Sequence, residues 1–149
     1  MDADRQVGNV RRLLTGAEIR SVGRAADMGV LELTGPHGEL LGLHVQCPFR
    51  IVHGDQVLLG SRDMGYVRDG AEDDAFATLY DDRAALLNRV LDGARPTVET
   101  VHEGAAGALT LEATSGLRVE VFPDRSGGEE SWRALARGGP HYGYPPGVV

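Results

Sequence analysis

The sequence predicts a single α+β domain that contains one unit twice, each copy with a helix and three or four antiparallel strands. Two recurrences predict the duplication. Residues 14–17 (Leu-Thr-Gly-Ala) return as 91–94 (Leu-Asp-Gly-Ala), and the alternating segment 43–48 returns as 117–123. Self-similarity in a fixed order is typical of a duplicated supersecondary unit. We therefore expect two halves around one core, with a pseudo-twofold relation between them.

Helical spacing followed by alternation predicts the elements of the first copy, about residues 4–67. Val7, Val10, Leu13 and Leu14 recur at the spacing of one helix face, and a glycine follows them. Alternating apolar residues then predict strands, and glycine-rich segments predict the turns between them. The expected strands are 19–24, 30–34, 40–47, 49–53 and 57–61.

The second copy, about residues 76–137, repeats this order after an acidic linker at about 68–75. Its helix is expected to begin at Asp81 or Asp82, since an aspartate can accept hydrogen bonds from free N–H groups of the first turn. The residues expected to face inward are Leu86, Leu87, Val90 and Leu91. The expected strands are 98–102, 108–114, 117–122 and 131–136.

Residues 138–149 have the Gly/Pro composition of a tail, and Tyr142 and Tyr144 are the residues expected to anchor it. The strands have one polar face, which suits antiparallel sheets with one side in water. The pattern leaves open whether they make one curved sheet or two packed sheets.

Charge and composition narrow the classes of function. A net charge of −7 argues against nucleic-acid binding, which needs a basic surface, and permits a basic protein partner. No apolar run is long enough to span a membrane, and the charged N-terminus is not a secretory signal, so we expect a cytoplasmic protein. All fifteen basic residues are arginine, which indicates a GC-rich coding bias and weakens any argument from an arginine alone.

Cys47 is the residue that most suggests nucleophilic chemistry, because His44 lies three positions before it. On a strand, however, those two side chains point to opposite faces. The recurrence also matches Cys47 with Val121, an apolar residue. A buried cysteine behaves as a small apolar residue, and we therefore expect Cys47 to pack in the core.

The polar face of the same strand carries the candidate catalytic residues. His44 and Gln46 match Arg118 and Glu120 in the recurrence. If the two strands lie close together, His44 and Glu120 could serve as acid and base, with Gln46 and Arg118 binding an anionic ligand. The alternative is an ordinary solvent-facing strand with cross-strand charge pairs.

An aromatic residue precedes an arginine in each copy, at Phe49-Arg50 and at Trp132-Arg133. Arg50 and Arg133 could bind the carboxylate or phosphate of a ligand through bidentate hydrogen bonds. Alternatively, each could form an ion pair with an internal carboxylate such as Asp63 or Glu130. The five histidines have no metal-binding spacing, and no nucleotide-binding or calcium-binding motif occurs. The sequence thus predicts no metal and no cofactor.

One pattern carries a family resemblance. Residues 43–51 (Leu-His-Val-Gln-Cys-Pro-Phe-Arg-Ile), with the later Phe122-Pro123-Asp124, Trp132-Arg133 and Pro140-His141, resemble a group of small actinobacterial proteins. The pattern spans roughly residues 30–141, and this chain has Phe49 where those proteins prefer tryptophan. The resemblance implies a bacterial, cytoplasmic origin and implies no activity.

Two functional hypotheses remain from the residues. The first is a small acidic binding or interaction protein of the immunity or accessory type, without a catalytic motif, whose surface would include Glu72-Asp73-Asp74 or the tail. The second is a small pocket enzyme or small-molecule binder acting on an anionic metabolite between the two copies. The sequence leaves open whether the protein is an enzyme, and it leaves the oligomeric state open.

Overall fold

Two antiparallel sheets and two α-helices make up the described part of the chain, residues 8–67 and 77–147 of a computed structural model. The helices are α2 (Asn9–Leu14) and α3 (Leu79–Ala94). The strands are β1 (Glu18–Ala25), β2 (Met28–Thr34), β3 (Leu40–Val45), β4 (Phe49–His53), β5 (Gln56–Gly60), β6 (Val98–Glu103), β7 (Leu109–Ala113), β8 (Leu117–Val121), β9 (Trp132–Ala136) and β10 (His141–Tyr144). The α+β class is thereby confirmed.

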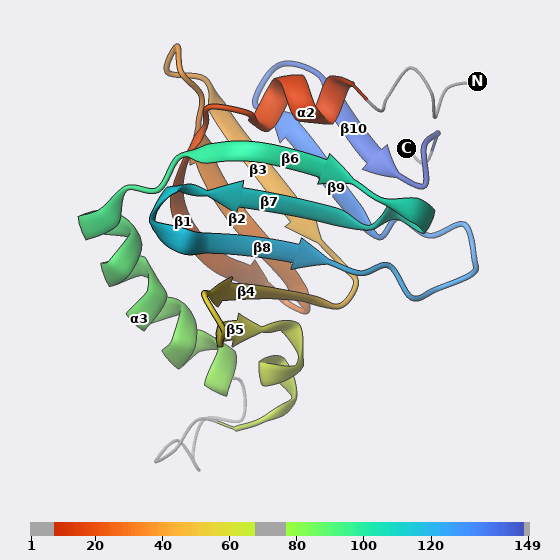
Figure 1. Cartoon of the computed structure of the whole chain (residues 1–149). Coiled ribbons are helices and arrows are strands. Elements are labelled where there is room, and N and C mark those ends of the chain that lie inside the picture. The colour runs from red at the N-terminus through yellow and green to blue at the C-terminus, as the bar shows by residue number, and fades with distance from the viewer. Residues whose placement is uncertain (1–7, 68–76, 148–149) are drawn as a thin grey trace.

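The strands form two packed sheets. Sheet A has the order β1-β2-β3-β9-β10, and sheet B has the order β5-β4-β8-β7-β6 (Figure 1). Each sheet combines three strands from one part of the chain with two from the other. Strand β4 pairs with β8, and strand β9 pairs with β3. The two halves of the chain therefore complete each other's sheets.

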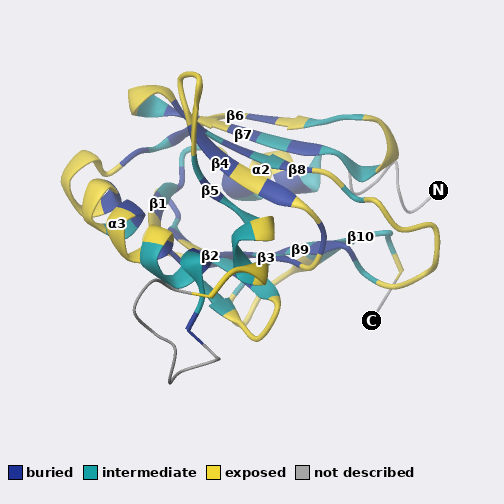
Figure 2. Cartoon of the chain, turned by 90° about the horizontal axis from the view of Figure 1, so that it is seen from below, coloured by how far each residue is buried: buried dark blue, intermediate teal, exposed yellow. Residues whose placement is uncertain are grey.

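The core lies between the two sheets because alternate residues of each strand point inward. In β3, Leu41, Leu43 and Val45 are buried, whereas His44 on the other face is only half-buried. Phe49 and Trp132 are also buried in this core. Figure 2 shows buried residues along the strands of both sheets and exposed residues concentrated in the loops and on α3. Each sheet consequently has one dry face and one outer face.

The two helices close the sides of the sandwich. Helix α3 packs against β1 and β5, and α2 packs against β6 and β9. Thr78 is the N-cap of α3: its hydroxyl accepts from the Asp81 N–H, and the Asp81 carboxylate accepts from the Thr78 N–H. The cap expected at Asp81 or Asp82 is thus wrong by one turn, since Asp81 supplies the reciprocal bond of a capping box.

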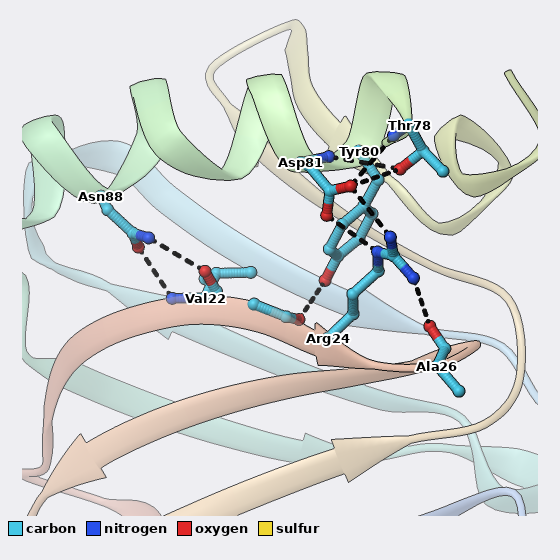
Figure 3. A network of polar contacts seen from close by, with 8 residues as sticks. Val22, Arg24, Ala26, Thr78, Tyr80, Asp81 and Asn88 are labelled. Atoms are coloured by element: carbon cyan, nitrogen blue, oxygen red, sulfur yellow. Dashed lines mark hydrogen bonds and ion pairs between the residues drawn. The ribbon is translucent and has the colours of Figure 1, made fainter. Parts of the chain in front are cut away.

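The Asp81 carboxylate also joins the helix to the sheet, as Figure 3 shows. Arg24 of β1 donates two hydrogen bonds to it, at 2.8 and 2.9 Å. These bonds lower the pKa of Asp81 to about 2. The Tyr80 hydroxyl donates to the Gly23 carbonyl at 2.7 Å beside this pair.

Two turns further along α3, Asn88 binds the open edge of β1 (Figure 3). Its Oδ1 accepts from the Val22 N–H at 2.8 Å, and its Nδ2 donates to the Val22 carbonyl at 3.0 Å. The side-chain amide takes the place that a neighbouring strand would occupy. Covering an edge in this way protects a sheet against pairing with other chains.

The inward face expected for α3 is wrong at two residues. Leu86 and Val90 of α3 were expected to face inward, but each is 51% exposed, and the buried residues of the helix include Tyr80 and Ala84 instead. The reason is that α3 covers the open side of the sandwich and touches it along one narrow stripe.

The expected Gly/Pro tail contains the last strand of sheet A. Strand β10 pairs with β9, and the ring of Tyr144 stacks on that of Trp132 with centroids 6.2 Å apart. The anchoring expected of Tyr142 and Tyr144 is confirmed, since both pack against the core. The acidic linker, including Glu72-Asp73-Asp74, and the first residues of the first expected helix lie outside the described residues.

Neither helix in the described part of the chain has the length and apolar character that crossing a bilayer requires.

Candidate functional site

The candidate residues of sheet B form a closed ion-pair cluster on its outer face. Arg50 of β4 lies directly opposite Glu120 of β8. Arg50 Nε donates to Glu120 Oε1 at 2.6 Å, and Arg118 Nε donates to Glu120 Oε2 at 3.2 Å. The Arg50 guanidinium also lies 5.9 Å from the centre of the Phe122 ring. Partial burial opposes the charge of Glu120, but the hydrogen bonds from Arg50 and Arg118 hold its pKa below the usual value.

The candidate residues of sheet A lie on the opposite side of the molecule. His44 of β3 faces Arg133 of β9 across the strand pair. Arg133 forms an ion pair with Glu130, in which Nη2 donates to Oε2 at 2.7 Å. The Nη1 atom of Arg133 lies 3.2 Å from Nδ1 of His141. Burial, and then the charge of Arg133, lower the pKa of His44, which favours its neutral imidazole.

The structure therefore does not bring His44 and Glu120 together. They lie on the outer faces of different sheets, and the apolar core fills the space between those sheets. The space between the sheets, where His44 and Glu120 would have to meet, is thus occupied by core side chains. The alternative of solvent-facing strands with cross-strand charge pairs describes the cluster of Arg50, Arg118 and Glu120.

Gln46 lies just beyond the end of β3 and is exposed. Its side-chain amide is 3.5 Å from the Met28 sulfur, and its backbone carbonyl accepts from Arg125 Nη2 at 2.9 Å. It belongs to neither charged cluster.

Cys47 is buried, as expected, with 7% of its surface exposed. Burial, helped by the nearby Asp124 carboxylate, raises the pKa of its thiol to about 11. The thiolate is the reactive form of cysteine. At neutral pH this thiol is therefore protonated and chemically inert.

For the two aromatic-arginine pairs, the alternative of an internal carboxylate named Asp63 and Glu130, and one of these two partners is observed. Arg133 satisfies an internal carboxylate, Glu130, as expected, whereas Arg50 uses Glu120 and not Asp63. Asp63 accepts instead from the backbone N–H of Gly60 at 2.9 Å. Phe49 and Trp132, which precede the arginines, are both core residues.

A hollow of about 390 Å³ opens on the outer face of sheet A, and we call it the Gly42 hollow. Gly42 contributes no side chain at the centre of the sheet. The nearest atoms to the position of a Cβ there are Nε2 of His44 at 3.5 Å and Cγ of Leu135 at 3.7 Å. Val30, Leu40 and Leu135 give the hollow apolar walls, and Arg20, Glu32, His44 and Arg137 give it polar ones.

An irregularity in β1 adds to the hollow. The register of β1 with β2 shifts between Ile19 and Ser21, which makes Arg20 the extra residue of a bulge. Ile19 and Val22 both point into the core, so the two residues between them both face outward. Bulges of this kind redirect a side chain, here the arginine, and are frequent beside binding sites.

A second hollow, of about 420 Å³, lies between α3 and β5. It is lined in part by Val57, Leu86 and Val90, each about half exposed. The sequence missed it because Leu86 and Val90 were assigned to the core.

The sequence analysis also missed most of the Gly42 hollow, although it singled out His44, which lines it. The signal that was present is a glycine in the middle of a strand, which is unusual unless another group approaches closely. Within residues 8–67 and 77–147, no three His, Cys, Asp or Glu side chains are grouped so that they could hold a metal ion.

Comparisons of the chain with models of protein families, with curated protein sequences and with solved structures find no match. The resemblance of residues 30–141 to small actinobacterial proteins stays a prediction.

Proposed function

We propose that this chain is a small acidic binding protein without a catalytic centre and that it holds its ligand in the Gly42 hollow. The observation that carries the proposal is a difference between the two sheets in the side chain that the central strand carries at one position. Gly42 lies opposite Glu32 of β2, and Arg118 of sheet B lies opposite Glu112 of β7. Where sheet B carries a long, ion-paired arginine, sheet A carries no side chain at all.

The chemistry of the candidate residues supports binding rather than catalysis. The Cys47 thiol is protonated, and His44 and Glu120 are separated by the core. The Glu120 carboxylate is already occupied by Arg50 and Arg118. A binding site needs none of these groups to be reactive; it needs a concave, partly apolar surface with a few polar groups around it.

The proposal is tested by filling the hollow. The Gly42→Leu variant and the wild-type protein are incubated with a small-molecule extract of host cells, washed, and weighed by native mass spectrometry. We expect a bound small mass on the wild-type protein and its loss from Gly42→Leu, because the leucine side chain occupies the site. Arg118→Leu, on sheet B, is the matched control and should keep the bound mass. A mass that persists on Gly42→Leu, or the absence of any bound mass on the wild type, contradicts the proposal.

We also propose that the two halves are copies of one unit related by a pseudo-twofold axis. The strand orders support this proposal. Sheet A has the order β1-β2-β3-β9-β10, and sheet B, read from its other edge, has the order β6-β7-β8-β4-β5. In both sheets, three consecutive strands of one half are followed by two strands of the other half. Helix α2 precedes the first of these strands in one half, and α3 precedes it in the other.

This correspondence changes the residue matches. Arg133 faces His44, and Arg50 faces Glu120, so His44 corresponds to Glu120. By the same pairing Val45, which faces Trp132, corresponds to Val121, which faces Phe49. The sequence recurrence had matched Val121 with Cys47.

A further inference from the structure

We infer that the ligand of the Gly42 hollow is a small monocarboxylate with an apolar body. This inference rests on the proposed function, because it names the class of ligand for the same site. It follows from three properties of the hollow: where its apolar surface lies, which charges line it, and what remains unpaired.

The apolar body is indicated by the floor and walls. Gly42 has no side chain and is itself buried, with Nε2 of His44 and Cγ of Leu135 3.5 and 3.7 Å from where its Cβ would lie, so a flat group rests on these neighbours. Leu40 is 53% exposed although it borders the hollow, and Leu135 and Val30 are half-buried. A ligand ring or alkyl chain placed here removes apolar surface of these residues from water, at about 25 cal/mol per Å². On sheet B the matching space is closed, since Val52, the strand neighbour of Arg118, is only 3% exposed.

The negative charge is indicated by the arginines. Arg20 and Arg137 line the hollow together with one carboxylate, that of Glu32. Arg20 is held by Glu18 at 3.2 Å. Arg137 is exposed and makes no ion pair with any described residue, although its backbone N–H donates to the Leu40 carbonyl at 2.9 Å. A guanidinium at the edge of an apolar hollow is suited to a carboxylate, which it can bind through two parallel hydrogen bonds.

Glu32 limits the charge of the ligand to one. Its carboxylate lies 3.4 Å from the Ser21 hydroxyl and stays close to the hollow. Arg20 and Arg95 share the carboxylate of Glu18, so Arg20, Arg95 and Arg137 against Glu18 and Glu32 leave one positive charge to balance. A phosphate monoester, which carries nearly two negative charges at pH 7, would be repelled by Glu32 more strongly than a carboxylate.

His44 supplies a neutral hydrogen-bonding group at the other end. Its Nε2 is the atom nearest to the Cβ position of Gly42, and the charges of Arg133, Glu130, His141 and Glu32 act on its ring. A neutral imidazole can donate to or accept from a polar atom of the ligand. Arg137 and His44 lie on either side of Gly42, so the ligand lies between them over the glycine.

The test uses five probes on the full chain: 3-phenylpropanoate, its amide, 3-phenylpropylammonium, 2-phenylethyl phosphate and acetate. Dissociation constants are measured from the shifts of the Gly42 and Leu135 backbone amide signals in two-dimensional NMR titrations. We expect 3-phenylpropanoate to bind at least about tenfold more tightly than each of the others, because only it combines one negative charge with an apolar body. In Arg137→Gln the preference for the carboxylate over its amide should fall to within about twofold, and Arg118→Gln should leave it unchanged.

The outcomes separate the two proposals. If the amide, the ammonium or the phosphate binds as tightly as the carboxylate and Gly42→Leu removes that binding, the hollow is the site and the carboxylate inference is overturned. An unchanged preference in Arg137→Gln overturns the inference as well. If no probe gives a saturable shift, the carboxylate inference is overturned, and the proposed function is judged by the native mass spectra alone. If Gly42→Leu binds a probe like the wild type, both the inference and the proposed function are contradicted.

Discussion

The outer faces of the two sheets differ at the strand positions that we propose as equivalent. On sheet B, Glu120 binds Arg50 and Arg118, and the neighbouring Val52 is covered. On sheet A, the corresponding strands carry His44 opposite Arg133 and Gly42 opposite Leu135. The outer face of sheet B is filled by its own side chains, and that of sheet A has a hollow beside a buried glycine.

The difference shows how a binding surface can arise on a sheet without new backbone. A carboxylate that already has two arginine partners gains little from a ligand, since the ligand would have to replace hydrogen bonds of equal quality. A glycine in a strand leaves both space and apolar neighbours that are only partly covered. The charged cluster, which looks more functional in the sequence, is therefore the poorer binding site.

The largest expected effect on stability comes from sheet B. Replacing Glu120 by alanine leaves Arg50 and Arg118 beside each other without their shared carboxylate, and we expect the free energy of unfolding to fall by about 1–2 kcal/mol. The corresponding His44→Ala on sheet A should cost no more than about 0.5 kcal/mol, because the imidazole is half-buried and packs loosely over Gly42. Urea denaturation at pH 7 measures both. Equal losses would show that the two faces are not energetically different.

A smaller change is expected when Gly42 becomes alanine. An alanine Cβ there meets His44 and Leu135 at ordinary contact distances, and the backbone is not left-handed. Because glycine loses more chain entropy on folding, we expect Gly42→Ala to raise the free energy of unfolding by about 0.5–1 kcal/mol. Gly29→Ala is the control that should destabilise, since its Cβ would collide with the ring of Phe49 in the core. Thermal unfolding of both variants gives the comparison, and a destabilised Gly42→Ala would mean that the hollow is not open space.

The faces should also respond to acid in different pH ranges. The pKa of His44 is lowered from 6.5, so the unfolded chain takes up a proton first, and stability is lost as the pH falls from 6.5 through the folded pKa. The pKa of Glu120 is lowered from 4.5, so its contribution is fully present above 4.5 and is lost as the pH falls through its folded pKa. We expect His44→Gln to flatten the stability profile around pH 6, and Glu120→Gln to flatten it only below 4.5. The measurement is the free energy of unfolding from pH 8 to pH 3. The expectation is wrong if His44→Gln changes the profile only below pH 4.5, or if Glu120→Gln changes it around pH 6.

The strands were predictable from the sequence because one face of each is dry. The alternation in 40–47 and 117–122 gave β3 and β8 to within a few residues. The exchange of β4-β5 and β9-β10 between sheets was not predictable, because alternation records which face is buried and carries no information about the neighbouring strand. The role of residues 138–149 was missed for a related reason: His141 to Tyr144 form an edge strand whose residues are half-buried at best.

The candidate site was predictable only in part. The polar face of β3 was assigned correctly, and His44 lines the hollow that we propose as the site. Arg118, Glu120 and Arg50 were singled out because they are charged, yet they satisfy one another on the far sheet. Arg137 and Leu135 gave no signal, since they become neighbours of Gly42 only when β9 pairs with β3.

The exchange of strands also has a consequence for the order in which the protein can be completed during translation. Strand β3 is synthesised before its partner β9, which begins only at Trp132. Sheet A, with the hollow and its Leu135 wall, thus cannot be finished until β9 and β10 have left the ribosome. Contacts this distant in sequence fold slowly, because a long loop of chain must be closed before they form. A messenger truncated before β9 would yield a product that retains Gly42 and His44 and lacks the wall that completes their site.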